Sequence, residues 1–444
     1  MTPVRRTVPE PAFEAVAAEG ASVALRDGVA GRSPLEELLA KGRLRATLAM
    51  LGPAFVASIA YVDPGNFATN LQGGAKYGYL LLWVVLLANL VAMLIQYLSA
   101  KLGIVTDQNL PENIRARSPR AVTFAMWIQA EVMAMATDIA EFLGAALGLN
   151  LLFGVPLLVA GLLTGVIAFA ILELQSRGFR RFELAITSLL GIIFVGFLYE
   201  TLKIGPSVHE SLHGLLPGLS GSSSLYLAVG IIGATVMPHV IYLHSALTKG
   251  RMPVRSDRER ARVLRFERTD VIIALGLAGI VNMAMLAVAA KLFHTPALSG
   301  LSTIPQAHME FGRLVGGTAA LAFAVALLAS GASSSSVGTY AGQVVMGGFT
   351  NFRIPLMLRR ALTMIPALVV LALGMNPTDA LVLSQVVLSF GIPVALIPLV
   401  ILTCRRDVMG VFVNRRLTTI LAWGCAGLIT GLNLFLLYQQ FFMS

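Results

Sequence analysis

Four consecutive residues, Asp63, Pro64, Gly65 and Asn66, place an acid, a helix breaker, a glycine and an amide inside the long apolar run 47–72. An acid in the middle of a membrane helix costs about 2.5–3.5 kcal/mol on insertion scales. Proline removes a backbone donor and clashes with the preceding turn. Backbone groups freed in hydrocarbon must find partners or line a polar cavity. These residues therefore predict a broken membrane helix that forms a site, with two side-chain oxygens near one face.

A second apolar run, 223–248, carries Met237, Pro238 and His239 at its middle. If both prolines break their helices, unwound backbone at Ala60 and Ala234 offers free carbonyl oxygens. The Met237 thioether contributes little to Mg²⁺ or Ca²⁺ but favours borderline transition metals. Oxygen ligands with one thioether suit Mn²⁺ or Fe²⁺ and also accept Cd²⁺ or Co²⁺. The alternative is that Met237 packs in the core and that the prolines only kink ordinary helices.

Three acids, Glu131, Asp138 and Glu141, lie seven and three residues apart in the run 121–153. On a helix they share one stripe of about 80°. Acids on one stripe of a membrane helix indicate a proton or cation path. The alternative is a structural stripe of ion pairs. Arg359 and Arg360 are candidate partners, or plain anchors at the cytoplasmic side.

Further polar residues interrupt other apolar runs. His239 is a candidate metal ligand or proton carrier, and a hydrogen-bonded packing role is an equal alternative. Gln385 and Asn282 are isolated amides, which usually join membrane helices by hydrogen bonds; Gln385 is also a candidate ligand. The serine-rich run 330–338 favours close helix packing, and its hydroxyls are alternative Na⁺ ligands.

Composition defines the class of protein. The 444 residues are 56% hydrophobic and 13% charged, with a mean hydropathy of +0.78. Soluble domains carry about 25% charged residues, so the chain is a polytopic helical membrane protein. Cys404 and Cys425 lack the spacing of a metal cluster. The sequence contains no phosphate-binding loop and no nucleophile–base arrangement, so we expect neither an ATP-driven pump nor an enzyme.

Eleven apolar runs are long enough to cross a membrane. Their limits are 47–72, 79–103, 121–153, 156–175, 183–204, 223–248, 269–292, 313–346, 355–375, 379–402 and 417–441. With the N-terminus inside, the inner segments hold 29 of the 33 Lys and Arg residues. This asymmetry predicts a cytoplasmic N-terminus and an extracellular C-terminus. It also explains the net charge of +10 without nucleic acid.

The two broken runs are the first and the sixth. Five spans per unit is an odd number, so the second unit enters the membrane with opposite orientation. Two inverted five-helix repeats with broken first helices are typical of secondary transporters. We expect a cytoplasmic tail at 1–45 with a short helix near 35–39, repeats at 46–204 and 205–402, and an eleventh helix within 403–444. The basic loop 249–268 is expected to form a separate surface helix.

The paired motifs, Asp63-Pro-Gly-Asn66 and Met237-Pro-His239, resemble the signatures of the Nramp family of proton-coupled divalent metal transporters, most closely its bacterial manganese transporters. The resemblance covers about residues 45–440. It implies an all-α leucine-transporter-like fold of ten core helices plus an eleventh. It also implies metal ligation by Asp63, Asn66 and Met237, by the carbonyls of Ala60 and Ala234 in different states, and by Gln385 in the occluded state.

The same resemblance implies that Asp63, near His239, first accepts the proton. Asp138, Glu141, Arg359 and Arg360 would then form a route to the cytoplasm, beside Glu131 on the same stripe. The divalent metal would be the substrate, with no resident cofactor, in a monomer of the cell membrane. Two rival functions remain: an Na⁺-coupled amino-acid symporter of the same fold, whose substrate carboxylate Asp63 would repel, and a receptor or scaffold.

Overall fold

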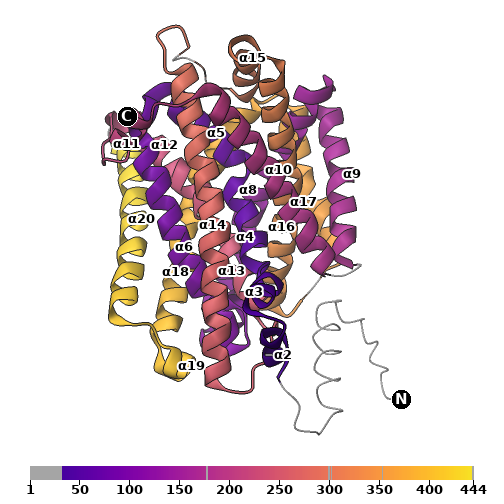
Figure 1. Ribbon diagram of the computed structural model, residues 1–444, viewed down its shortest axis with the longest axis vertical. Coiled ribbons are helices and arrows are strands. Elements are labelled where there is room, and N and C mark those ends of the chain that lie inside the picture. The colour runs from indigo at the N-terminus through magenta and orange to yellow at the C-terminus, as the bar shows by residue number, and fades with distance from the viewer. Residues whose placement is uncertain (1–32, 177–178, 299–300, 302, 353, 443–444) are drawn as a thin grey trace.

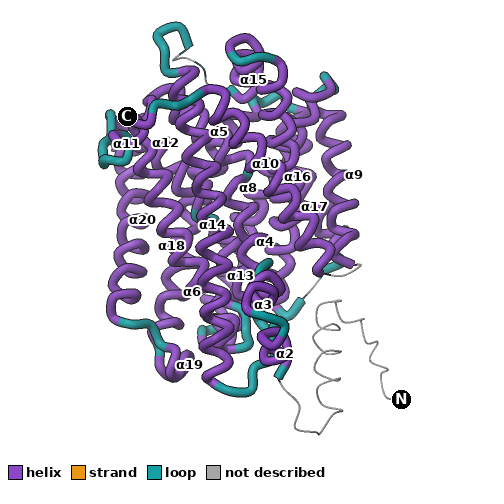
Figure 2. The backbone as a smooth tube through the Cα atoms, viewed as in Figure 1, coloured by secondary structure: helices purple, strands orange, loops and turns teal. Residues whose placement is uncertain are grey.

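The computed structural model describes residues 33–176, 179–298, 301, 303–352 and 354–442, and these residues form helices and loops without strands (Figures 1 and 2). Long helices run nearly parallel to one axis of the molecule, and short helices cover the two ends. The first half of the chain forms α2 (Pro34–Ala40), α3 (Arg43–Met50), α4 (Pro53–Ile59), η1 (Ala60–Val62), α5 (Pro64–Tyr77), η2 (Gly78–Leu81), α6 (Leu82–Thr106), α7 (Leu110–Arg117), α8 (Arg120–Phe153), α9 (Leu157–Ser176) and α10 (Phe179–Ile204).

The second half continues the helical bundle. It forms α11 (Val208–His213), α12 (Gly221–Thr235), α13 (Pro238–Thr248), α14 (Asp257–Phe293), α15 (Ile304–Leu314), α16 (Gly317–Thr350), α17 (Leu356–Ala372), α18 (Pro377–Cys404), α19 (Arg406–Met409), η3 (Gly410–Phe412) and α20 (Arg416–Phe442). Each of the eleven predicted apolar runs overlaps one or more of these helices.

Within the described residues, eight helical stretches are long and apolar enough to cross a membrane. One of them, Pro64–Thr106, joins α5, η2 and α6, and two shorter apolar helices are Pro53–Val62 and Leu157–Glu173. The all-helical membrane class is therefore confirmed. The count of eleven crossings and the inverted repeats stay predictions.

Both predicted helix breaks are confirmed. Asp63, with φ −81° and ψ 169°, is extended between η1 and α5, and Pro64 is the first residue of α5. Met237, with φ −76° and ψ 123°, is extended between α12 and α13, and Pro238 is the first residue of α13. Proline suits this position because the first helical N–H has no partner within the helix. Each proline thus starts a new helix instead of kinking an old one.

Close packing explains the serine- and glycine-rich run of α16. A side chain at Gly331 would collide with the backbone of Ala145, and one at Gly148 of α8 would collide with the backbone of Leu328. Small residues let membrane helices approach to backbone contact, where van der Waals packing replaces the missing hydrophobic drive. The two helices that carry the acid stripe and the serine run are therefore fixed against each other.

The cytoplasmic-side predictions are corrected in one respect. The basic segment 249–268 does not form a separate surface helix, because residues from Asp257 onward are the first turns of the 37-residue α14. Ser256 caps this helix by accepting a hydrogen bond from the backbone N–H of Glu259. The expected helix near 35–39 is present as α2, whereas α3 runs across the predicted boundary at residue 45. Residues 1–32 of the predicted tail lie outside the described residues.

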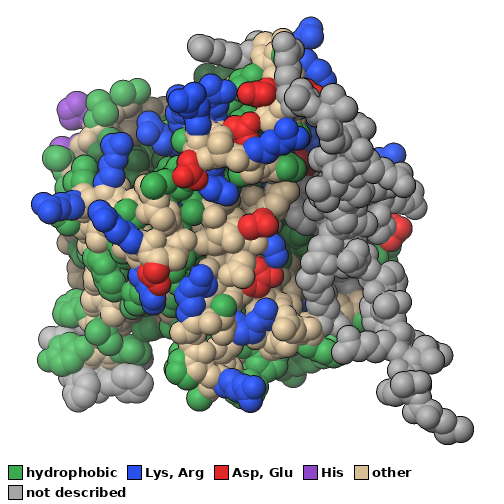
Figure 3. Space-filling model, turned by 90° about the horizontal axis from the view of Figure 1, so that it is seen from below, with side chains coloured by type: hydrophobic (Ala, Val, Ile, Leu, Met, Phe, Trp, Pro, Cys, Tyr) green, Lys and Arg blue, Asp and Glu red, His purple; other side chains and the backbone are tan. Residues whose placement is uncertain are grey.

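Lys and Arg side chains gather on the end of the molecule where α2, α3 and α19 lie (Figures 1 and 3). This end holds the loops that the charge count places inside. α20 then runs the length of the bundle, so that the C-terminus lies at the opposite end (Figure 1).

Candidate metal site and acid stripe

One side-chain amide joins the two helix breaks. The Asn66 Nδ2 atom donates to Asp63 Oδ1 at 2.7 Å and to the Ala234 carbonyl oxygen at 3.0 Å. The Asn66 backbone N–H donates to the same carboxylate oxygen at 2.9 Å, so that Asp63 caps α5. All three residues are buried. Two acceptor oxygens, one from each broken helix, therefore converge on a single donor.

This arrangement suits a cation. Oxygen atoms that share one N–H₂ donor can equally surround a positive ion that takes the place of that donor. The second carboxylate oxygen, Asp63 Oδ2, has no hydrogen-bond partner among the described residues. The Asn66 amide oxygen accepts from the Thr235 hydroxyl at 3.3 Å. Rotation of the Asn66 amide by half a turn would bring that oxygen to the side of Asp63 and Ala234 and complete a set of oxygen donors.

Neighbouring helices hold the carbonyls that the first break frees. The Ser330 hydroxyl of α16 donates to the Val62 carbonyl at 2.6 Å, and the Asn282 side chain of α14 donates to the Tyr61 carbonyl at 2.6 Å. Asn282 also accepts from Asn70 of α5 at 3.1 Å, which links the segments on both sides of the break. The helix-joining role predicted for Asn282 is thus confirmed. Nothing in the sequence predicts the hydrogen bond from Ser330 to Val62. In the sequence, Ser330 is only one of several small polar residues in a run that favours close helix packing.

The remaining predicted ligands lie around the same breaks. Met237 is fully buried at the N-terminus of α13, three residues after Ala234, and Ala60 is the buried first residue of η1. Gln385 of α18 lies against both breaks: its side chain packs on Gly65 beside the first, and its backbone packs on Gly233 beside the second. A side chain at Gly65 would collide with the Gln385 amide, and one at Gly233 would collide with its backbone carbonyl. Gln385 Oε1 has no hydrogen-bond partner among the described residues.

His239 connects the second break to the acid-bearing helix. Its Nδ1 atom lies 3.2 Å from the Thr137 hydroxyl of α8, and its Nε2 atom has no hydrogen-bond partner among the described residues. Thr137 precedes Asp138 in α8. The imidazole therefore lies between the metal-site helix and the acid stripe.

The acid stripe of α8 is paired with the two arginines of α17. Arg359 Nη2 lies 2.5 Å from Glu131 Oε2, and Arg360 Nη1 lies 3.5 Å from Asp138 Oδ1. Arg360 also hydrogen-bonds the Ser335 hydroxyl of α16. The predicted partnership is therefore present. Ion pairs of this kind are compatible with both interpretations of the acid stripe, a structural role and a path for protons or cations.

Glu141 extends the stripe toward the first break. A side chain at Gly338 of α16 would collide with the Glu141 carboxylate and come into tight contact with the Asp138 carboxylate, so both acids lie beside this glycine. One turn further along α8, the ring of Pro64 packs directly against Gly144, which has no side chain. The stripe therefore leads along α8 from Glu131 to the backbone beside Asp63.

A second buried polar network lies beside α4 and η1, on the N-terminal side of the first break. Gln96 donates to the Tyr61 hydroxyl at 2.6 Å, and its oxygen lies 3.0 Å from His244 Nδ1. His244 Nε2 lies 2.9 Å from a carboxylate oxygen of Glu267. The Asp270 carboxylate of α14 accepts the backbone N–H groups that begin α4. These partners come from five helices, so single-sequence patterns gave no means of pairing them.

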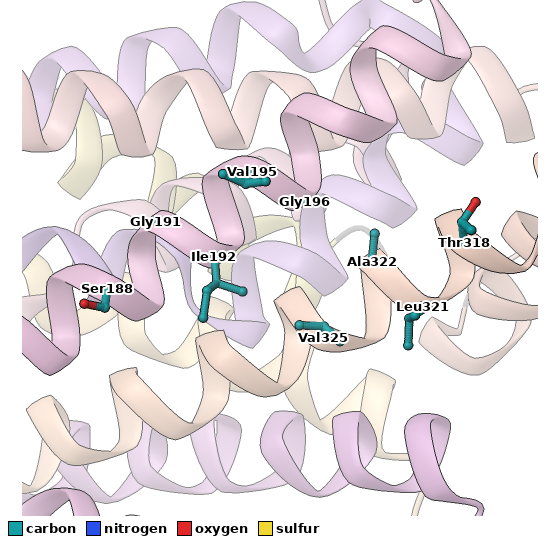
Figure 4. A pocket seen from close by; sticks show the side chains of 9 residues that line it. All are labelled: Ser188, Gly191, Ile192, Val195, Gly196, Thr318, Leu321, Ala322 and Val325. Carbon is teal, nitrogen blue, oxygen red and sulfur yellow. The ribbon is translucent and has the colours of Figure 1, made fainter.

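A shallow apolar hollow of about 570 Å³ lies elsewhere, between α10 and α16. Figure 4 shows the residues of α10 and α16 that line it, among them Ile192, Val195, Leu321 and Val325. None of the candidate ligands or paired acids lines this hollow. A charged substrate has no partner there, so the breaks remain the candidate site.

A bundle of apolar helices with two broken helices whose oxygen atoms converge is typical of membrane transport proteins. Comparison with known proteins identifies the family. Residues 54–439 match the family model "Nramp: Natural resistance-associated macrophage protein-like", so the chain belongs to the Nramp family. It is 54% identical over 396 residues to the "Divalent metal cation transporter MntH" of Deinococcus radiodurans, an alignment that covers 89% of this chain and 91% of that protein.

Solved structures of other transporters have the same fold. The structure resembles the Eremococcus coleocola manganese transporter, with a TM-score of 0.82 and 33% identity, over 90% of this chain and 89% of that one. It shares its fold with Mhp1, a nucleobase-cation-symport-1 family transporter, with a TM-score of 0.58 and 15% identity, over 87% of this chain and 91% of that one. The family resemblance seen in the sequence is confirmed.

Proposed function

We propose that this protein imports divalent transition metal ions, Mn²⁺ and Fe²⁺ foremost and also Cd²⁺ and Co²⁺, into the cytoplasm together with protons by alternating access. The observation that carries the proposal is the convergence of Asp63 Oδ1 and the Ala234 carbonyl on Asn66 Nδ2. The family and the relative named a divalent metal cation transporter support it. The ion is the substrate, and no resident cofactor is required.

In this proposal the metal is held by Asp63, Asn66 and Met237, with the carbonyls of Ala60 and Ala234 and the side chain of Gln385 entering in different states. Asp63 supplies the anionic oxygen and Asn66 a neutral one. The Met237 thioether favours transition metals over Mg²⁺ and Ca²⁺, which prefer hard oxygen ligands. The free acceptor atoms Asp63 Oδ2 and Gln385 Oε1 support this assignment.

Protons in this proposal pass from Asp63 near His239 to the stripe of Glu141, Asp138 and Glu131, where Arg360 and Arg359 balance the negative charge. In this proposal the ion pairs between α8 and α17 line a route that is separate from the metal path. The metal itself leaves when the inner half of the first broken helix, α4 and η1, moves. Proton and metal therefore need not share one exit.

The proposal includes eleven spans in two inverted repeats plus one, with the N-terminus in the cytoplasm and the C-terminus outside, and a functional monomer. An inside-negative potential favours cation entry by about 2.3 kcal/mol per charge per 100 mV. Import is then the downhill direction for a divalent cation. The concentration of Lys and Arg at the end that holds α2, α3 and α19 supports this orientation.

Uptake into proteoliposomes tests the function. We expect Mn²⁺ and Cd²⁺ to enter with acidification of the lumen, while Mg²⁺ and Ca²⁺ do not enter. The rival function predicts Na⁺-dependent entry of an amino acid instead, and neither the family nor the buried Asp63 carboxylate favours it. A receptor or scaffold would show neither flux.

A further inference from the structure

The chain before the first broken helix forms a strap, defined here as residues 33–52, that lies on the basic end of α14. It contains α2 and α3, and Leu51 and Gly52 then lead directly into α4. The family match begins at residue 54, so the strap precedes the matched region. Its position makes it the covalent extension of the inner half of the first broken helix.

Apolar contacts seat the strap. Leu35 of α2 is fully buried in a cluster with Met50 of α3 and Val263 of α14, and Phe266 of α14 packs against this cluster. Burial of such side chains is the main favourable contribution to docking of a short helix. The apolar cluster is separate from the large core that surrounds the metal site.

Polar contacts fasten the strap to α14 at both ends. At its start, the Ser33 side chain lies beside the Glu259 carboxylate. Ser33 and Glu36 also form a reciprocal capping box that begins α2. At its end, the backbone N–H groups of Gly52 and Ala54 donate to Asp270 Oδ2 at 3.2 and 3.0 Å. Both ends of the strap therefore contact acidic residues of the same helix, α14.

The two contact points of the strap on α14 are held at a fixed distance from each other. Glu259 and Asp270 lie eleven residues apart in a continuous helix, which is about 16 Å along its axis. α4 can therefore move away from α14 only if the Asp270 bonds break and the strap slides, bends or lifts from the apolar cluster. A docked strap opposes that movement.

We propose that the strap is a restraint on the inner gate: docked on α14, it holds α4 in place and keeps the site closed to the cytoplasm, and its release permits metal exit. This inference rests on the proposed function, because it assigns a transport role to movement of α4. The strap then sets how often the inner gate opens, without contacting the metal.

Cysteine accessibility tests the restraint. In a background with Cys404→Ser and Cys425→Ser, Ala57→Cys places a reporter at a fully buried position of α4. We expect Leu35→Ser or the milder Leu35→Ala, and independently Val263→Ser, to speed labelling by N-ethylmaleimide by about tenfold, because docking loses a buried side chain. Glu37→Ala, on the exposed face of α2, is the matched control and leaves the rate unchanged.

A second reporter separates gate opening from general loosening. Ala92→Cys lies fully buried in α6 and keeps its labelling rate if only α4 is released. An equal increase at both reporters, or no increase at Ala57→Cys, overturns the proposal. Labelling needs no metal, so its outcome stands apart from the proposed function, which fails if the unmodified protein takes up no Mn²⁺.

A locked strap gives the opposite result. Leu35→Cys and Val263→Cys, joined by a short cleavable thiol cross-linker in the same cysteine-free background, should slow Mn²⁺ uptake at least about tenfold, and reduction of the linker should restore it. Uptake that is unchanged by a complete cross-link contradicts the restraint. Cross-linker applied to the Leu35→Cys variant alone controls for modification of one thiol.

Discussion

Asn66 is the residue that makes the two helix breaks a single site. Its Nδ2 atom satisfies Asp63 and Ala234 together, while its amide oxygen accepts from Thr235. A buried polar group without a partner is costly, so an amide that serves three neighbours stabilises the site when no ion is bound. Under the proposed function, binding of a cation would exchange one satisfied arrangement for another.

At the residue scale, substitution of Met237 tests whether its thioether sets the selectivity for transition metals. In Met237→Ala, Mn²⁺ uptake should persist while Ca²⁺ competes at least roughly fivefold better, because the soft sulfur that favours transition metals is gone. Competition by Ca²⁺ and Mg²⁺ against radiolabelled Mn²⁺ measures this. Met409→Ala, at a buried methionine of α19, controls for the loss of packing. Unchanged selectivity in Met237→Ala would remove the thioether from the ligand set.

Ser330 tests the support of the break. In Ser330→Ala the Val62 carbonyl loses its 2.6 Å donor, and an unsatisfied buried acceptor costs about 1–3 kcal/mol. We expect the KM for Mn²⁺ to rise roughly fivefold or more, with a smaller effect on the maximal rate, because the residue before Asp63 is no longer held. Ser330→Thr retains the hydroxyl and should restore the KM. A normal KM in Ser330→Ala would show that this bond does not position the site.

At the scale of elements, the sequence predicted the two breaks because each joins a proline to polar or sulfur-bearing neighbours in an apolar run. It also predicted the stripe of α8, since helical spacing alone brings its acids to one face. The basic segment before residue 269 was predicted as a separate surface helix because its dense charge is unlike a membrane span, whereas from Asp257 onward it is continuous with α14.

Long-range pairings lay beyond prediction from one sequence. The bonds from Ser330 to Val62 and from Gln96 to Tyr61 join helices far apart in the chain. Their register depends on side-chain packing at backbone contact, as between Gly331 and Ala145. Periodicity identifies the buried face of a helix, whereas the partner of each polar group depends on which face the neighbouring helix presents.

The pairing of α8 with α17 carries a prediction at the element scale. Asp138→Asn removes the partner of the buried Arg360, and breaking a buried ion pair costs about 3–5 kcal/mol. We expect a lower melting temperature together with Mn²⁺ entry that no longer acidifies the lumen. Asp407→Asn, in an exposed pair with Arg405, should change neither property. Normal luminal acidification in a folded Asp138→Asn protein would show that the stripe is only structural.

At the scale of the whole molecule, the bundle brings two chain segments about 170 residues apart to one buried point. α16 packs on α8 and on the first break, α14 holds the first break through Asn282, and α18 presents Gln385. The hollow between α10 and α16 and the basic end of the molecule lie apart from this point. The proposed function therefore places the metal between the two breaks.

Crystals soaked in Mn²⁺ and measured at the manganese absorption edge test this claim most directly. We predict one dominant anomalous peak within about 2.0–2.6 Å of Asp63 and Asn66 oxygens and near the Met237 sulfur, and its absence in Asp63→Ala crystals. The same map surveys the serine run of α16 and the basic surface. A dominant peak at any of these other places, or none at the breaks under saturating Mn²⁺, would contradict the account.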